Sequence, residues 1–226
     1  MDNADELFLQ VVQKLDAGNV LQQMVLVGSW VLPVYRVYFD DAPEIPLLRT
    51  TDVDFLIAMP PRIVGEMDIP ASLEELGFEP NWSVQGGYCK YVHPDMEVEF
   101  LIPEHGKGAG HAITVDQLRV NAQPLRFLGL AHQRSIVVNY KGYGIRVPEP
   151  EAFVLLKVLI LPRRKVSTKR QKDIDTVTAL GEFLTGRPDR RTKMIEIFRA
   201  LPGGWQKRIR HTAEQTFPWM TSVLTS

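Results

Sequence analysis

The hydrophobic pattern of this chain changes character near Pro148, and that change restricts the possible folds more than any other feature. Before Pro148, short apolar runs bounded by Gly, Pro and Asp alternate with amphipathic helical segments. After Pro150, apolar residues recur at helical spacing, and Pro and Gly residues divide the segment into four parts. We therefore predict an α+β chain with a mixed β-sheet domain flanked by helices over residues 1–148 and a C-terminal helical subdomain over residues 149–226.

Local signals give the predicted elements of each part. Ser72 is expected to cap one helix and Gly77 to close it, and a hairpin is expected to turn at Lys141 and Gly142. The predicted helices cover residues 4–18, 31–39, 69–78, 151–161, 167–184, 189–201 and 205–217. One predicted strand begins at residue 24 and ends at a Gly-Ser turn. The other predicted strands cover residues 53–59, 87–93 and 96–103, and the predicted hairpin covers residues 135–148.

Composition narrows the class of protein. The chain has 226 residues, of which 45% are hydrophobic and 23% charged, as expected for a globular protein. The single cysteine, Cys89, excludes an internal disulfide and a cysteine-based zinc site. No apolar run is long enough to span a bilayer, and the acidic start does not resemble a secretory signal. We therefore expect a cytoplasmic protein without a membrane partner.

Charge is divided unevenly between the two parts. Residues 1–150 hold 11 Lys and Arg against 20 Asp and Glu, whereas residues 151–226 hold 15 against 7. An acidic part that holds cations and a basic part that holds phosphates would give this pattern. Two domains that simply attract each other would give the same pattern, and the sequence leaves both interpretations open.

Four acidic residues lie at alternate positions in two predicted strands. Asp52 and Asp54 would share one face of a strand whose Val53 faces the core, and Glu97 and Glu99 would do the same in a later strand. If the strands are neighbours, three or four carboxylates converge, and a divalent cation such as Mg²⁺ is the usual compensation for such repulsion. Solvent-exposed acids without a metal explain most such pairs when each is considered alone.

A Gly-Ser turn upstream strengthens the interpretation of the acids as part of a functional site. Gly28 and Ser29 end an apolar strand and begin a helix, where backbone N–H groups and a hydroxyl can bind an anion. A phosphate site beside a carboxylate cluster is the arrangement of phosphoryl or nucleotidyl transfer. The glycine-rich segment 104–112 could also hold phosphate, but a plain loop is the better interpretation. Arg49 could reach the same site or cap the strand, and we favour the second.

The segments VGSW, TTDVDFL and VEFL, taken in this order along the chain, resemble the signature motifs of the nucleotidyltransferases of the DNA polymerase beta type. The segment RVPEPEAFVLLKVLILPRRKVSTKRQKD is similar to the corresponding segment of a group of uncharacterised bacterial members of this family. Together, the matching segments span roughly residues 24–185. It implies a nucleotidyltransferase-like catalytic domain over residues 1–148. It also implies transfer of a nucleoside monophosphate from a nucleoside triphosphate, ATP for example, to a hydroxyl of a small molecule, RNA or protein, with two Mg²⁺ ions as cofactors and release of pyrophosphate.

The resemblance also implies roles for individual residues. Asp52 and Asp54 would bind both metal ions, and Glu99 would complete the metal site nearest the acceptor and could accept the acceptor's proton. The family has Asp more often at the third position, and Glu97 remains an alternative to Glu99. Gly28 and Ser29 would hold the β and γ phosphates.

Basic residues of the second part are candidates for phosphate contact. Residues 163–172 contain six basic side chains, which could bind triphosphate, a nucleic acid or only water. Lys157 and Lys172 are either phosphate ligands or partners in structural salt bridges. Two alternatives to an enzyme therefore remain: a catalytically silent nucleotide-binding or regulatory protein of the same fold, and a nucleic-acid-binding module.

Overall fold

The computed structural model describes residues 3–45, 51–58, 60–61, 63–84, 86–104 and 110–224. It divides into two compact units, each described separately below. The first unit comprises Met1–Val34 and Arg49–Pro148, and the second comprises Tyr35–Leu48 and Glu149–Ser226. Within the described ranges, every helix is too short or too polar to cross a membrane.

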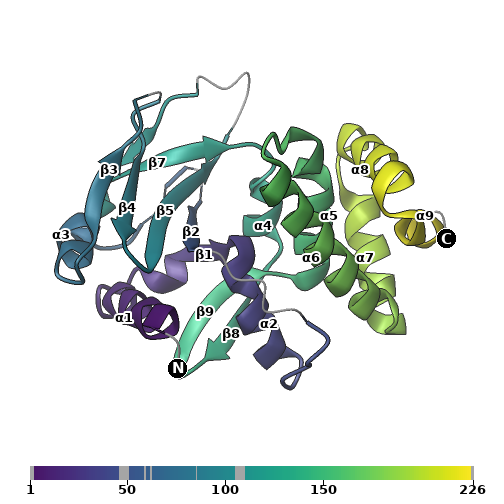
Figure 1. Ribbon diagram of the computed structural model, residues 1–226, viewed down its shortest axis with the longest axis horizontal. Helices are drawn as coiled ribbons and strands as arrows, with labels where there is room; N and C mark the ends of the chain where they lie inside the picture. Colours follow the sequence, from purple (N-terminus) through teal and green to yellow (C-terminus); the bar gives the residue numbers. More distant parts are fainter. Residues whose placement is uncertain are drawn as a thin grey trace. The chain divides into compact units, whose positions relative to one another are not determined.

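The first unit is built on a mixed sheet, and its strand order explains where the acids lie. Neighbouring strands follow the order β1-β2-β5-β4-β3, with β7 pairing with β5 and β6 pairing with β7 (Figure 1). The strands are β1 (Met24–Val27), β2 (Asp52–Ile57), β3 (Glu79–Trp82), β4 (Cys89–His93), β5 (Met96–Pro103), β6 (Ile113–Val115), β7 (Val120–Leu125), β8 (Ser135–Tyr140) and β9 (Tyr143–Pro148). Strands β2 and β5 run parallel, and the remaining neighbours on the main path are antiparallel.

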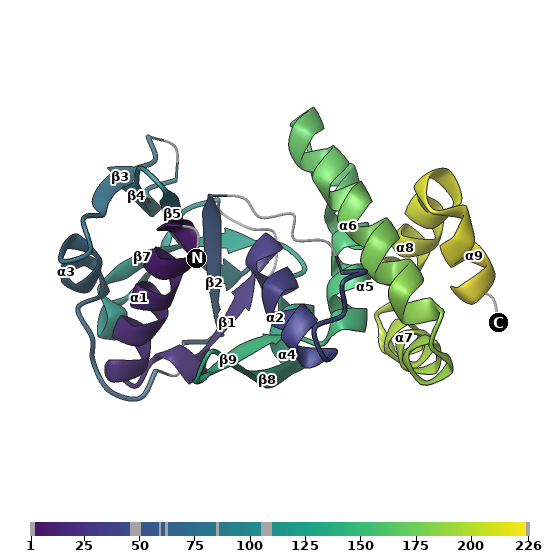
Figure 2. The same ribbon diagram turned by 60° about the horizontal axis from the view of Figure 1, so that its bottom comes forward.

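Short helices accompany these strands. They are α1 (Asn3–Ala17), α2 (Val31–Tyr38), α3 (Ile69–Glu74), α4 (Gly129–Gln133) and the 3₁₀ turns η1 (Leu21–Gln23), η2 (Gly28–Trp30) and η3 (Asp116–Leu118). The unit boundary falls within α2, so its residues from Tyr35 onward belong to the second unit. The apolar face of α1 is buried, and the helix contacts β5 and β9 (Figure 2). The Phe8 ring of α1 stacks on Trp30 with 4.5 Å between ring centroids. This contact anchors the residue that directly follows the Gly28–Ser29 turn.

The second unit is helical beyond the end of β9. Its elements are α5 (Pro150–Ile160), η4 (Leu161–Arg163), α6 (Ser167–Thr185), α7 (Pro188–Ala200), α8 (Gly203–Thr216) and α9 (Pro218–Leu224). Helix α5 is buried over almost its whole length because it contacts α6, α7 and α8 (Figure 1). This explains why its sequence is apolar on all sides rather than on one face.

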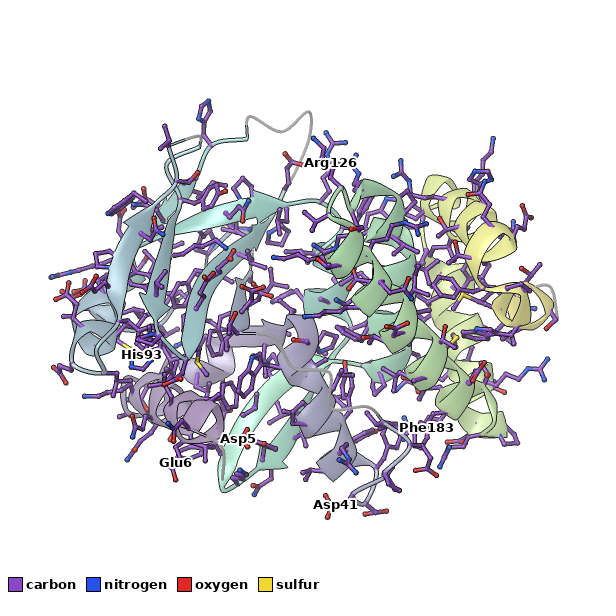
Figure 3. The ribbon with its side chains drawn as sticks, viewed as in Figure 1. Asp5, Glu6, Asp41, His93, Arg126 and Phe183 are labelled. Carbon is purple, nitrogen blue, oxygen red and sulfur yellow. The ribbon has the colours of Figure 1, made fainter. Side chains whose placement is uncertain are left out.

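Residues 35–45 belong to the helical unit although they lie between two strands of the sheet in sequence. The Tyr35 ring meets the Phe153 ring edge-on at 5.7 Å, and the Phe39 ring meets Phe183, labelled in Figure 3, at 5.0 Å. Arg190 donates a hydrogen bond to the Tyr38 hydroxyl at 3.1 Å. The predicted first domain, residues 1–148, includes this segment, because contacts so distant in sequence leave no local pattern.

Most predicted elements are present with small differences at their ends, and the α+β fold class is confirmed. The predicted Lys141–Gly142 turn joins β8 to β9, and both residues have positive φ. The capping assignment of Ser72 was wrong. Asp68 caps α3 by accepting a hydrogen bond from the Ala71 N–H at 3.0 Å, whereas the Ser72 hydroxyl donates to the Asp68 carbonyl.

Candidate active site

The acids of β2 and β5 meet because the two strands pair in parallel. Asp52 lies opposite Glu97, and Asp54 lies opposite Glu99. Residues paired across neighbouring strands point to the same face of a sheet, so the four acids share one face. Val53 and Val98, which alternate with them, are fully buried on the other face. The predicted neighbourhood of these strands is therefore confirmed, and it depends on a pairing between segments far apart in sequence.

Three of these carboxylates form a compact group. One oxygen from each of Asp52, Glu97 and Glu99 lies within 4.8 Å of the others. Glu99 is 9% exposed, whereas Asp52 and Glu97 are partly exposed. The group therefore opens towards solvent at Asp52 and Glu97 and extends inward to Glu99.

Asp54 lies beside the Gly28–Ser29 turn. Strand β1 ends at Val27, which pairs with Asp54 of β2, so the turn begins directly beside that acid. Gly28 has a φ of +76°, and a Cβ atom at this position would collide with the Asp54 carboxylate. Glycine is thus required here both by backbone conformation and by the close approach of the acid. The turn η2 then leads into α2, as the sequence predicted.

Lys90 of β4 is a cation that contacts two of these acids. It is paired with Glu99 across the β4–β5 ladder, and its ammonium contacts Glu99 Oε1 and lies 3.5 Å from Glu97 Oε2. Burial lowers the pKa of Lys90, but the hydrogen bond and charge of Glu99, with the charges of Glu97 and Asp52, raise it to about 12. The lysine is therefore positively charged at neutral pH and offsets part of the acidic charge.

Lys90 was not among the predicted site residues, although the predicted hairpin contained the necessary signal. The chain turns from β4 to β5 at Pro94 and Asp95, so His93 pairs with Met96. Each step away from a two-residue turn then pairs one residue from each strand, and the third step places Lys90 opposite Glu99. Figure 3 labels His93 at the turn end of β4, where its ring packs 5.4 Å from the Phe78 ring.

Lys157 and Lys172 lie in the helical unit and differ in their surroundings. Lys157 is buried in α5, and its ammonium donates to Asp173 Oδ1 of α6 at 2.6 Å. Arg164 donates to the other oxygen of Asp173 at 2.7 Å. Lys172 is exposed on α6. The structural salt bridge considered for Lys157 is therefore present, and phosphate contact by either lysine stays a prediction.

Two further predictions fall on residues outside the described ranges. Arg49, expected to cap the strand, is one of them. Most of the glycine-rich segment 104–112, namely residues 105–109, also lies outside these ranges.

The donor chemistry of the acidic group fits a hard divalent cation. Carboxylate oxygens are preferred ligands of Mg²⁺ and Mn²⁺, and three of them converge from two rigid strands. A compact turn at Gly28, with its backbone in a conformation that glycine favours, lies beside the fourth acid. This face of the sheet can thus hold cations and, beside Gly28, an anionic group.

The chain is similar to known proteins over most of its length. A protein-family model described as Nucleotidyltransferase matches residues 6–194. Among solved structures, an antigenic nucleotidyltransferase-like protein from Paracoccidioides brasiliensis is 18% identical, with a TM-score of 0.47 and coverage of 98% of this chain and 93% of that chain. The antibiotic-resistance factor ANT(2'')-Ia is 14% identical, with a TM-score of 0.46 and coverage of 88% and 94%. No curated protein matches the chain at a significant level.

The family model spans most of the sequence, including both acidic strands and helices α5 and α6. It confirms the resemblance seen in the segments VGSW, TTDVDFL and VEFL and the enzyme class predicted from it. The chain belongs to the nucleotidyltransferase family.

Proposed function

We propose that this protein transfers a nucleoside monophosphate from a nucleoside triphosphate to an acceptor hydroxyl. The hydroxyl oxygen forms a bond to the α-phosphorus, the bond from that phosphorus to the bridging oxygen of the β-phosphate breaks, and pyrophosphate leaves. The observation that carries the proposal is the convergence of Asp52, Glu97 and Glu99 within 4.8 Å on the sheet face that also bears Asp54 and the Gly28 turn.

Mg²⁺, as two ions, is the cofactor that we propose for this site. Asp52 and Asp54 would hold both ions, and Glu99 would complete the site nearest the acceptor, with Glu97 as the alternative third acid. Bound Mg²⁺ supplies positive charge that stabilises the attacking and leaving oxygens. Glu99 accepts the proton of the acceptor hydroxyl in this scheme. Its low exposure supports this role because water competes less for a buried base.

The nucleotide is proposed to bind through its phosphates. Backbone N–H groups at Gly28 and Ser29 precede helix α2, where the positive end of the helix dipole favours an anion. Lys157 and Lys172 are proposed as further phosphate ligands, which for Lys157 requires sharing its ammonium with Asp173. The acceptor stays open among small molecules, RNA and proteins, as does the base of the nucleotide. A cytoplasmic location also stays a prediction.

The direct test is a transfer assay. The protein is mixed with α-labelled ATP, CTP, GTP or UTP, MgCl₂ and a cell extract, and both pyrophosphate and labelled acceptor are measured. We expect release of pyrophosphate with at least one nucleotide, together with a labelled product whose mass identifies the acceptor.

The variant Asp54→Asn provides the control for this assay. It should reduce transfer by at least about a hundredfold because it removes a charge that the proposed metal site needs. The fold should persist, since the substitution also relieves repulsion among the acids. Full activity of Asp54→Asn would contradict the assignment. Nucleotide binding without any transfer would instead favour the silent regulatory protein.

A further inference from the structure

Lys90 is held against the third acid by the fold itself. The β4–β5 register places it opposite Glu99, and its ammonium contacts Glu99 Oε1 and lies 3.5 Å from Glu97 Oε2. The side chain of Glu99 is 11% exposed and that of Lys90 is 30% exposed. The acid is thus enclosed, whereas the lysine that neutralises it retains a route to solvent.

Lys90 and a bound divalent cation would compete for the same carboxylates. Glu97 and Glu99 belong to the group that could hold a metal ion, and both are partners of Lys90. A divalent ion bound by this group would lie within a few ångströms of the ammonium, and like charges at that distance repel strongly in a partly buried site. A single ammonium offsets one of the three negative charges of the group, so excess acidic charge remains to attract the metal.

We propose that Lys90 is an exchangeable counter-ion, which holds Glu99 and Glu97 in place in the metal-free protein and withdraws from Glu99 when a divalent cation binds. This inference rests on the proposed function, because it assumes that the acidic group binds the metal. Lys90 is then a positioning residue that weakens metal affinity and keeps the empty site folded. The flexible lysine stem and the partly exposed Glu97 allow the ammonium to move outward without leaving the site.

Metal binding and stability of Lys90→Met test this inference without any activity measurement. Methionine keeps a long unbranched side chain and removes the charge. Mn²⁺ is titrated into nucleotide-free protein and followed by the electron paramagnetic resonance signal of free Mn²⁺. We expect binding about tenfold tighter or more than in the wild type, because a charge a few ångströms away typically shifts an ionic equilibrium by about one to three powers of ten.

Thermal unfolding gives the second readout. After treatment with EDTA, Lys90→Met should melt at a lower temperature than the wild type, because its acids lack their counter-ion. Saturating Mn²⁺ should then raise its Tm by more than it raises that of the wild type. Lys14→Met is the matched control, since Lys14 also pairs with a glutamate, Glu75, in the same unit. It should leave Mn²⁺ affinity unchanged.

Equal Mn²⁺ affinity in the wild type and Lys90→Met, or weaker binding in the variant, would overturn the inference while leaving the metal site in place. An absence of Mn²⁺ binding in both proteins would overturn the inference and the proposed metal-dependent function together. If Lys90→Met does not fold, the double variant Lys90→Met/Glu97→Gln is compared with Glu97→Gln. Removing the lysine must again tighten Mn²⁺ binding, and unchanged affinity would contradict the proposal.

Discussion

Glu99 combines low exposure with an acidic side chain, and its surroundings explain why such a residue is tolerated. Lys90 supplies one compensating charge across the strand ladder, and Asp52 and Glu97 provide the remaining donors of a possible cation site. Alternation along each strand predicted that the acids would share a face. It did not predict Lys90, because that inference requires the register of a hairpin as well as its existence.

Gly28 offers a test of the turn beside Asp54. Gly28→Ala and Gly142→Ala both place a side chain at positive φ, but only at Gly28 would the new Cβ collide with a carboxylate, since Gly142 faces open space. Each substitution should lower the free energy of unfolding by about 1–2 kcal/mol for the backbone strain. Transfer activity should be lost in Gly28→Ala alone. Urea unfolding and the transfer assay separate the two effects, and an active Gly28→Ala would contradict the role of this turn.

At the level of elements, local patterns predicted many of the strands and helices that bury an apolar face, but not β6, β7, α4 or α9. Strands β2 and β5 alternate clearly, and the turn at Lys141 and Gly142 marked the β8–β9 hairpin. Strand β3 was missed because it lies at the end of the strand order with exposed residues throughout and carries Pro80. Such a strand has no hydrophobic alternation to detect. The parallel pairing of β2 with β5 is set by contacts distant in sequence, which local periodicity does not encode.

The contact between α5 and α6 provides a prediction about stability. Asp173→Asn removes the carboxylate that compensates buried Lys157 and also accepts a hydrogen bond from Arg164. Because this leaves an uncompensated buried charge, we expect a loss of about 3–5 kcal/mol in the free energy of unfolding. Asp175→Asn is the matched control, because Asp175 is exposed on the same helix. Urea unfolding measures both, and equal effects would show that the buried ion pair has no special role.

For the whole molecule, the sequence predicted two parts and the change from sheet to helices near Pro148. The grouping of residues 35–45 with the helical unit was not predictable, because its evidence is contacts such as that between Tyr38 and Arg190, which are 152 positions apart. The acidic strands and the Gly28 turn lie together in the first unit, whereas Lys157 and Lys172 lie in the second. The residues of the proposed metal site therefore all lie in the first unit, whereas two of the proposed phosphate ligands lie in the second.

We propose that Asp52 and Glu99, brought together by parallel strands, bind divalent metal beside the Gly28 turn. The most direct test is a crystal structure of the protein with Mn²⁺ and a non-hydrolysable nucleoside triphosphate, measured at the manganese absorption edge. We expect an anomalous peak within bonding distance of the carboxylates of Asp52 and Glu99, with the triphosphate at Gly28 and Ser29. A bound nucleotide with manganese located elsewhere, away from these two acids, would contradict it.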